Sequence, residues 1–189
     1  MPKNYKKLTK DALLDKAANT VMLMKFLNSK GGVNLVQEYF SDSIPNYILE
    51  FAGLGDAAKW ILRQLARKSP NGFMNKVLNK SRDDGEYLAP LDSFETIENN
   101  KNHIITKINC LYLKKLRKKG KQYKCNFDMK EYYCKYACIP LLKKVHKDIY
   151  LNIDIELLKN GCIQTISVDS TSLSKHKEKD DEIEKNKSK

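Results

Sequence analysis

The sequence predicts an α+β fold, in which a helical N-terminal half is followed by a four-stranded antiparallel sheet, made of two hairpins, with helices packed on one face. Apolar residues near the N-terminus recur at helical spacing, as at Leu13, Ala17, Val21 and Met24. Two later pairs of segments alternate apolar and polar residues and are rich in β-branched side chains, as strands are. Turn residues join the members of each pair, which predicts two hairpins. Helices gathered on one face of such a sheet make an α+β domain.

The helical half is expected to begin at Thr9, whose hydroxyl can cap the first turn of a helix. That helix is expected to end at Gly31-Gly32, and a second helical run covers residues 33–40. Pro45 suits the start of a further helix, because its missing N–H is harmless in a first turn. The segment 69–72, Ser-Pro-Asn-Gly, predicts a turn, and one more short helix follows it.

The sheet half is predicted to run as hairpin, two helices and hairpin. The first hairpin turns within residues 99–102, and the second turns at Asn160-Gly161, the best hairpin dipeptide in the chain. A lysine-rich helix after the first hairpin is expected to end at Gly120. Asp128 and Glu131 form a D-x-x-E signal, which predicts the start of the next helix.

This layout divides the chain into three regions. Residues 1–80 form a helical N-terminal region, residues 81–170 form an α+β ligand-binding region of the same domain, and residues 171–189 form a charged tail. A length of 189 residues suits one domain rather than two. The tail is expected to be disordered, because it has too few large apolar residues to offset the entropy lost on ordering.

The net charge of +12 is carried by lysine, because only four of the 35 basic residues are arginine. Arginine reads bases and phosphates through paired hydrogen bonds, whereas lysine attracts any polyanion weakly. Nucleic acid is therefore an unlikely partner on composition. No apolar run is long enough to span a bilayer, and no apolar core of signal-peptide length follows the basic N-terminus. We therefore expect a cytoplasmic protein that does not bind membranes.

The chain has five cysteines, and this odd number without an export signal predicts reduced thiols. Cys134 and Cys138 share one face of a helix, and Leu141, Leu142 and Val145 continue that face. This predicts two small core residues on a stripe that Pro140 bends. The alternative is a zinc or iron–sulfur site, completed by Cys110 and Cys125, although the spacing lacks the close C-x2-C pairs typical of zinc sites. The sequence requires no cofactor.

Cys110 and Cys162 have a different position, because each lies at the end of a predicted strand. Strand ends line pockets more often than the middle of a helix does. Lys107, Lys114 and Lys115 are close to Cys110 in sequence and are expected to lower its pKa. Cys110 and Cys162 are therefore the candidate nucleophiles, and an ordinary buried cysteine is the alternative for each.

The remaining polar candidates are three isolated histidines and one basic cluster. His146 is expected to be a favourable cation at a helix C-terminus, and pairing of Cys110 with His103 or His146 stays open. The basic cluster predicts either a solvated helix face or a site that attracts an anion or nucleic acid. It comprises Lys114, Lys115, Arg117, Lys118, Lys119, Lys121 and Lys124.

Residues from about 94 to 168 resemble the L-2-amino-thiazoline-4-carboxylic acid hydrolase-like proteins and the related vinyl-reductase-type small-molecule-binding domains. The similar segments are "ITKINCLYLKKLRKKG", "YKCNFD" and "YLNIDIELLKNGCIQTI". In that family a cysteine closes a strand before a helix, and another follows a glycine-containing turn in the last strand. Cys110, Cys125 and Cys162 stand at the matching positions. The family often has proline after the first cysteine, where Leu111 stands here.

The resemblance implies helices on an antiparallel sheet around a ligand pocket. If the protein is an enzyme, it implies thiol-dependent opening of a C–N bond in a small ring, with Cys110 or Cys162 as nucleophile. Cys125, Lys107 and Trp60 are then the expected ligand-binding residues. Two alternatives stay open: a non-catalytic sensor or adaptor that forms a homodimer through its N-terminal helices, and a metal-binding regulator with weak affinity for nucleic acid.

Overall fold

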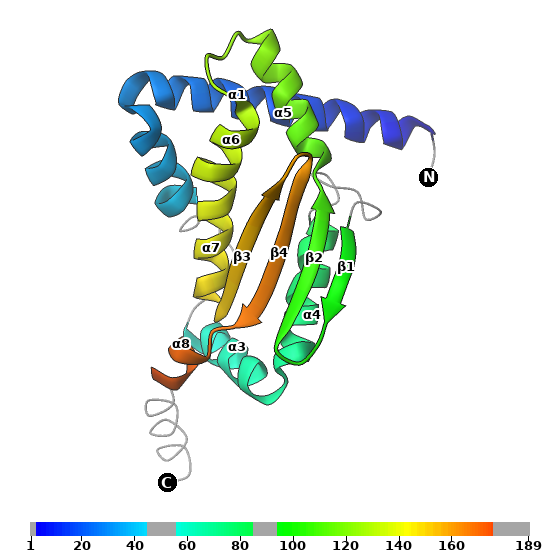
Figure 1. Ribbon diagram of the computed structural model, residues 1–189, viewed down its shortest axis with the longest axis vertical. Helices are drawn as coiled ribbons and strands as arrows, with labels where there is room; N and C mark the ends of the chain where they lie inside the picture. Colours follow the sequence, from blue (N-terminus) through cyan, green and yellow to red (C-terminus); the bar gives the residue numbers. More distant parts are fainter. Residues whose placement is uncertain (1–2, 45–55, 85–93, 176–189) are drawn as a thin grey trace.

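The computed structural model describes residues 3–44, 56–84 and 94–175, and its elements confirm the predicted α+β class (Figure 1). The four strands form one antiparallel sheet in the order β1-β2-β4-β3, so β2 and β4 pair at its centre. The strands are β1 (Phe94–Asn99), β2 (His103–Asn109), β3 (Leu151–Leu158) and β4 (Gly161–Val168). The helices are α1 (Lys3–Glu38), α3 (Asp56–Lys68), α4 (Pro70–Asp84), α5 (Leu111–Gln122), α6 (Met129–Tyr133), α7 (Ile139–Asp148) and α8 (Ser170–Lys175), with π-helical turns η1 (Tyr39–Ser43) and η4 (Cys134–Cys138).

The strand alternation sets one face of the sheet against helices. Ile104 of β2 lies opposite Ile166 of β4, which in turn lies opposite Ile153 of β3, and all three are buried. Residues that pair across an antiparallel ladder point to the same face. This face, which we call the inner face, packs against α4. Lys107 and Asp154 belong to the other face and are exposed.

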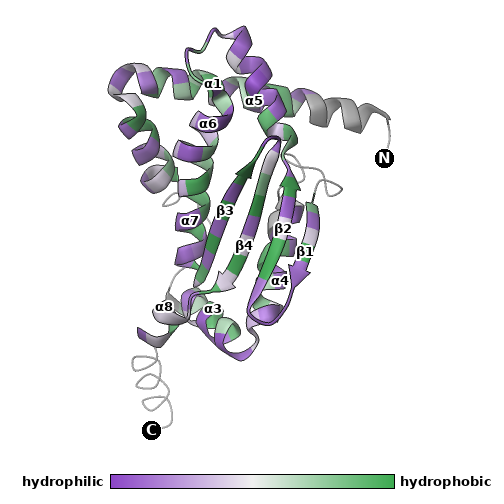
Figure 2. Ribbon diagram, viewed as in Figure 1, coloured by the Kyte–Doolittle hydropathy of each residue, from purple (hydrophilic) through white to green (hydrophobic). Residues whose placement is uncertain are grey.

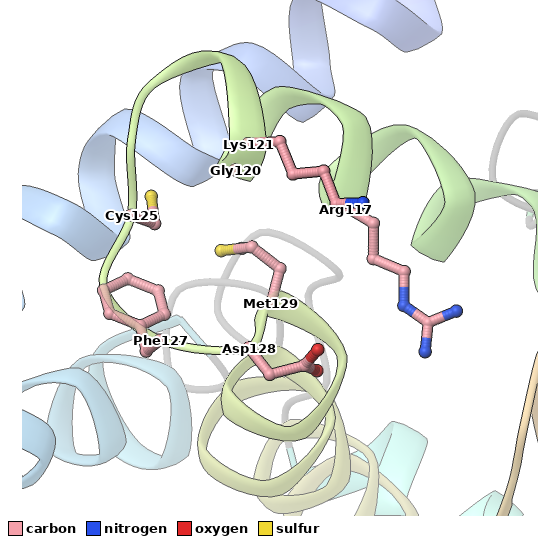
Figure 3. Close-up of a pocket in the computed structure, with 7 residues that line it drawn as sticks. All are labelled: Arg117, Gly120, Lys121, Cys125, Phe127, Asp128 and Met129. Carbon is pink, nitrogen blue, oxygen red and sulfur yellow. The ribbon is translucent and has the colours of Figure 1, made fainter.

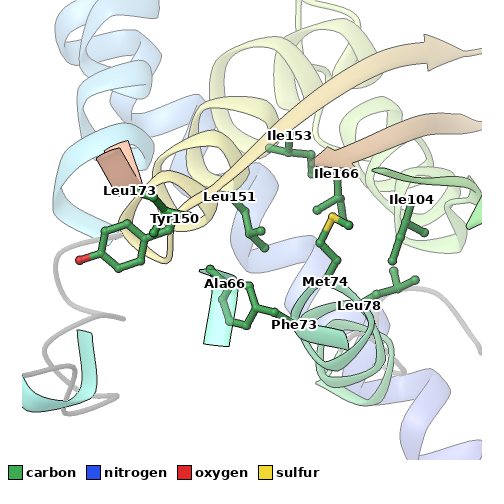
Figure 4. Close-up of a cluster of buried hydrophobic side chains, with 10 residues drawn as sticks. All are labelled: Ala66, Phe73, Met74, Leu78, Ile104, Tyr150, Leu151, Ile153, Ile166 and Leu173. Carbon is green, nitrogen blue, oxygen red and sulfur yellow. The ribbon is translucent and has the colours of Figure 1, made fainter. Parts of the chain in front are cut away.

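A first hydrophobic cluster holds α3, α4 and α8 against the inner face (Figure 4). Phe73, Met74 and Leu78 lie along one side of α4, and Met74 is fully buried. Leu151 of β3 and Leu173 of α8 complete the cluster. The prediction of disorder from residue 171 is wrong for residues 171–175, because burial of Leu173 stabilises α8. Residues 176–189 lie outside the described part.

A second hydrophobic cluster joins α1 to α5, α6 and η4, away from α3 and α4. Val21 and Met24 of α1 pack against Leu116 of α5 and Ala137 of η4, all of them fully buried. The Tyr112 hydroxyl adds a 2.7 Å hydrogen bond to the Thr20 hydroxyl. The N-terminal helices are therefore divided between two clusters, and Cys110 lies at the edge of the second.

Two separate helices were predicted on either side of Gly31-Gly32, and in the structure a kink at Gly32 divides the long helix α1. The φ of 66° and ψ of −158° at Gly32 are non-helical, and the chain bends there, as α1 does in Figure 1. The predicted start at Thr9 is wrong, because α1 begins at Lys3. The helix predicted to start at Pro45 falls mostly outside the described residues, except for its end in α3.

Three expected boundaries differ from the structure for local reasons. Ser69 alone separates α3 from α4, so the predicted Ser69–Gly72 turn is mostly a helical first turn that starts at Pro70. Gly120 does not end α5, which continues to Gln122. Asn160 does lie in the second hairpin turn, but Gly161 opens β4 and has no positive φ.

Asp128 caps α6 as predicted, accepting hydrogen bonds from the Lys130 and Glu131 amides at 2.8 and 3.0 Å.

Pro140 follows a π-helical turn instead of kinking a regular helix. Proline has no N–H and its ring crowds the preceding turn of an α-helix. The wider turn of η4, Cys134–Cys138, ends just before Pro140, which stands in the first turn of α7. The helix that holds Cys134 and Cys138 is thereby continuous with α7.

His146 does not act as a cation at the end of α7, contrary to expectation. Its side chain is buried, and Nδ1 donates a 2.8 Å hydrogen bond to the Leu142 carbonyl oxygen. Burial lowers the pKa of His146 below its usual value of 6.5, and the hydrogen bond offsets only part of this. The ring is therefore neutral at pH 7.

Within the described residues, no helix combines the length and the apolar character that crossing a membrane requires.

Candidate functional site

Cys110 stands where β2 ends and α5 begins, as predicted. Its backbone has extended geometry, with φ −79° and ψ 100°, and its N–H donates a 2.9 Å hydrogen bond to the Asn160 carbonyl in the β3–β4 turn. This bond holds the second hairpin against the first. The thiol makes no capping hydrogen bond. Burial raises the Cys110 pKa, and the Leu113 and Tyr112 amides of the first helical turn offset only part of this rise.

Cys162 is the second residue of β4 and points to the inner face. It lies opposite Ile108 of β2 on one side and Leu157 of β3 on the other. The Gln164 side-chain amide, two residues along the same face, donates to its sulfur at 3.6 Å. The register therefore places Cys162 beside the chain segment that carries Cys110.

The π-helical turn η4 brings Cys134 and Cys138 within electrostatic range of Cys110 and Cys162. Cys110 and Cys162 both raise the pKa of Cys134, and the three other thiols all raise the pKa of Cys138. Such coupling requires the thiols to be near one another. Cys110, Cys134, Cys138 and Cys162 are therefore one group, which we call the thiol cluster, at the end of the sheet where β2, α5 and the β3–β4 turn meet (Figure 1).

Burial controls the ionisation of the thiol cluster. Desolvation is the largest cause of the raised pKa of all four thiols, and it raises that of Cys134 from 9.0 to about 11. Tyr133 lies among them, and burial raises its pKa well above 10.0. All four thiols are free and half-buried. At pH 7 the cluster is an uncharged, polarisable group of S–H and O–H side chains.

The expectation that lysines lower the Cys110 pKa is wrong. Lys107 lies opposite Ile163 on the outer face of the sheet, whereas Cys162 points to the inner face. Lys107 instead forms a 3.5 Å ion pair with Glu95. The Cys110 pKa is raised because burial outweighs the two helix amides, and no lysine contributes to its shift.

Thr106 adds an unusual polar group to the inner face. Its side chain is 1% exposed, and its hydroxyl has no hydrogen-bond partner. It lies opposite Gln164, on the same face as Cys162. A buried hydroxyl without a partner costs about 1–3 kcal/mol, so such groups are few in folded proteins.

The other predicted ligand-binding residues lie apart from the thiol cluster. Cys125 is in the loop between α5 and α6, where it lines a separate pocket with Arg117 and Lys121. Trp60 lies on α3, which Figure 1 places at the opposite end of the sheet from the start of α5. The structure thus brings Cys110 and Cys162 together, adds Cys134 and Cys138, and separates Lys107, Trp60 and Cys125 from them.

Neither a metal geometry nor a histidine partner is present among the described residues of the cluster. No three or more Cys, His, Asp or Glu side chains within residues 3–44, 56–84 and 94–175 are arranged to hold a metal ion. His103 contacts Glu98 at 3.1 Å in the first hairpin, and His146 bonds to its own helix. The charged side chains that lower the Cys134 pKa are Lys130 and Arg117.

Sequence reasoning missed two residues of this site, Thr106 and Gln164. Both occupy inner-face positions that the strand alternation could identify, but their polarity there gave no separate signal. The missing partner of the Thr106 hydroxyl becomes visible only when the neighbouring elements are in place.

Comparison with family models, with curated proteins and with solved structures finds no significant match to this chain.

Proposed function

We propose that this protein binds a small molecule at the thiol cluster and the adjoining inner face of the sheet. The observation that carries the proposal is the convergence of four free thiols beside a buried hydroxyl that lacks a partner. Sites for small molecules are mostly apolar, with a few converging polar groups that fix orientation. Uncharged thiols, the Tyr133 ring and the Thr106 hydroxyl supply this combination.

The cluster favours a ligand with little charge and a polarisable ring. No thiol there is ionised at pH 7, and burial would penalise a charged ligand group placed among them. A ring nitrogen or carbonyl oxygen could accept a hydrogen bond from the Thr106 hydroxyl. The ring of a thiazoline, as in the hydrolases that the C-terminal half resembles, has these properties, and the carboxylate that such a substrate carries would have to stay outside the cluster.

The catalytic form of the proposal is hydrolysis of a C–N bond in such a ring. The sulfur of Cys110 or Cys162 would attack the ring carbon, its proton would pass to the departing nitrogen, and water would then release the thiol. The Tyr112 and Leu113 amides, which offset part of the rise that burial causes in the Cys110 pKa, would stabilise negative charge that develops beside Cys110. No cofactor is needed for these steps.

Replacement of the strand-end thiols tests the catalytic form. With 2-amino-thiazoline-4-carboxylate as the probe, Cys110→Ala or Cys162→Ala should slow ring opening by at least about 100-fold, because the nucleophile is gone. Chromatography of the ring-opened product measures the rate. Cys125→Ala is the matched control, because Cys125 is also a half-buried free thiol but lies outside the cluster.

The same variants separate an enzyme from a sensor. If both variants turn over the probe at the wild-type rate, the catalytic form is wrong. If the wild-type protein binds the probe without turnover, and both variants lose binding, the interpretation as a non-catalytic sensor or adaptor is favoured. One observation favours a partner surface for that alternative: Ile61 and Leu65, one turn apart on α3, are 51% and 37% exposed. A homodimer through this surface would fit the sensor.

Thr106→Val should stabilise the protein and weaken ligand binding at the same time. Valine has nearly the shape of threonine and removes the buried hydroxyl without a partner, so the free energy of unfolding should rise by about 1 kcal/mol. Urea denaturation measures this change in the ligand-free protein. Thr165→Val is the control, because Thr165 pairs with Ile105 on the outer face. A Thr106→Val variant that is less stable than wild type would contradict the assignment.

A further inference from the structure

The pocket between the second half of α5 and the start of α6 is separate from the thiol cluster (Figure 3). Its volume is about 400 Å³, enough for a small organic molecule. Its walls are formed by Arg117, Lys121, Cys125, Phe127, Asp128 and Met129. We call it the α5–α6 pocket.

The loop between the two helices builds one apolar end of this pocket. The Cys125 amide donates a 3.0 Å hydrogen bond to the Gly120 carbonyl, which turns the chain back over α5. Figure 3 shows the sulfur atoms of Cys125 and Met129 and the ring of Phe127 gathered at this end. Gly120 makes room for them, because a Cβ there would lie 2.3 Å from Cγ of Met129.

The other end of the pocket carries an excess of positive charge. Neither the Arg117 guanidinium nor the Lys121 ammonium makes a hydrogen bond or an ion pair within the described part of the chain. Among the described residues that line the pocket, Asp128 is the only acidic one, and its Oδ1 already caps α6. The Glu131 amide and, to a smaller degree, the Arg117 charge lower the Asp128 pKa, so one negative charge faces two positive charges.

The surroundings add to this field. The Lys25 ammonium of α1 donates a 2.9 Å hydrogen bond to the Tyr123 carbonyl. Burial raises the Cys125 pKa, and the Lys25 charge offsets part of that rise. The helix α5 has no acidic residue and is largely hydrophilic along its outer side (Figure 2). Unpaired cations beside apolar walls of low dielectric attract anions more strongly than cations on an open surface do.

We infer that the α5–α6 pocket binds a small organic anion, with its carboxylate held by Arg117 and Lys121 and its apolar body placed against Cys125, Phe127 and Met129. Arg117 has the planar pair of donors that suits a carboxylate, and Lys121 adds a second positive charge. The site is independent of the proposed function, because it shares no residue with the thiol cluster.

Fluorine NMR titrations of the full-length protein with 4-fluorobenzoate test this inference. Two controls each lack one of the recognised features. The probe 4-fluorobenzamide has the apolar ring without the negative charge, and inorganic phosphate has the charge without an apolar body. The affinity of phosphate, which has no fluorine, is measured by its displacement of 4-fluorobenzoate. We expect 4-fluorobenzoate to bind at least about 10-fold more tightly than either, and added salt to weaken its binding. Arg117→Met and Lys121→Met should each weaken its binding by at least about 10-fold. Lys118→Met, an exposed lysine of the same helix outside the pocket, should change it by less than about 2-fold.

Protection of individual cysteines from alkylation shows where the probe binds. Saturating 4-fluorobenzoate should slow the reaction of Cys125 with iodoacetamide by at least about 5-fold and leave Cys162 unchanged, as read by peptide mass spectrometry. Binding should persist in Cys110→Ala and Cys162→Ala, so failure of the proposed function would leave this result intact. The inference is overturned if the probe does not bind at millimolar concentration, if the amide or phosphate binds equally well, if Lys118→Met matches Arg117→Met, or if Cys125 is not protected.

Discussion

Gly161→Ala is expected to lower the free energy of unfolding by about 3 kcal/mol or more, a large loss of stability for the addition of one methyl group. A Cβ at Gly161 would lie 1.8 Å from the Ile108 carbonyl oxygen and 3.1 Å from the Cys110 amide nitrogen. Both are backbone atoms, so neither can turn away as a flexible side chain could. This overlap can be relieved only if β2 and β4 separate where Asn109 pairs with Gly161.

The position of this glycine joins stability to the site. Separation of the strands would break the hydrogen bond from the Cys110 amide to the Asn160 carbonyl and would shift Cys162, the next residue of β4. Any variant that still folds should therefore also lose the ligand binding that we propose for the thiol cluster. Urea denaturation measures the loss of stability, and the ring-opening assay measures the loss of the proposed activity.

Gly72→Ala is the matched control for this prediction. Its added Cβ would meet only the Ser69 side chain, whose hydroxyl can rotate, and Gly72 lies in the first turn of α4, where alanine is the better helix former. Its stability should stay within about 1 kcal/mol of wild type. A Gly161→Ala variant as stable as Gly72→Ala would mean that β2 and β4 do not approach each other closely at this pair.

Cys134 is expected to react with iodoacetamide at pH 8 at least about 10-fold more slowly in the folded protein than in urea. A pKa of about 11 instead of 9.0 leaves about 100-fold less thiolate, and the greater nucleophilicity of a more basic thiolate recovers about 10-fold of this. The half-buried position slows the reaction further. Peptide mass spectrometry at a series of reaction times gives the rate for each cysteine.

The pH dependence gives the sharper readout. Because burial raises the pKa of Cys134, its alkylation rate in the folded protein should still increase between pH 9 and pH 10. The same cysteine in the urea-unfolded chain serves as its own control and should level off earlier. A rate that is constant above pH 8 in the folded protein would show that the thiol is already ionised, which contradicts an uncharged thiol cluster.

The raised thiol pKa values also constrain the catalytic proposal. The pKa values of Cys110 and Cys162 are raised above 9.0, mainly by burial, so each thiol must lose its proton during the reaction. Transfer of that proton to the departing ring nitrogen meets this need. The pH dependence of the ring-opening rate should then reflect protonation of the substrate nitrogen. It should not reflect ionisation of a thiol near neutral pH.

Local patterns were sufficient for most of the secondary structure. Alternation of apolar and polar residues predicted all four strands, because successive side chains of a strand point to opposite faces. The alternation in β1 does not reflect burial, since five of its six residues are exposed. The Asp128 cap of α6 was predictable because it satisfies amides only two and three residues away. The start of α1 was missed because a capping residue such as Thr9 can also lie within a helix, and the position of Gly161 was misjudged because its constraint comes from β2 rather than from its own turn.

The sequence by itself determined the fold class, the strand-end positions of Cys110 and Cys162, and the reduced state expected of the thiols, because each depends on neighbours in the chain. Only the tertiary structure decided that Cys134 and Cys138 join them, that Lys107 lies on the far face, and that Thr106 has no partner. These facts depend on how η4 packs beside the sheet and on which way each pleat points. Burial, which sets the charge of every thiol in the cluster, arises only when residues distant in sequence enclose it.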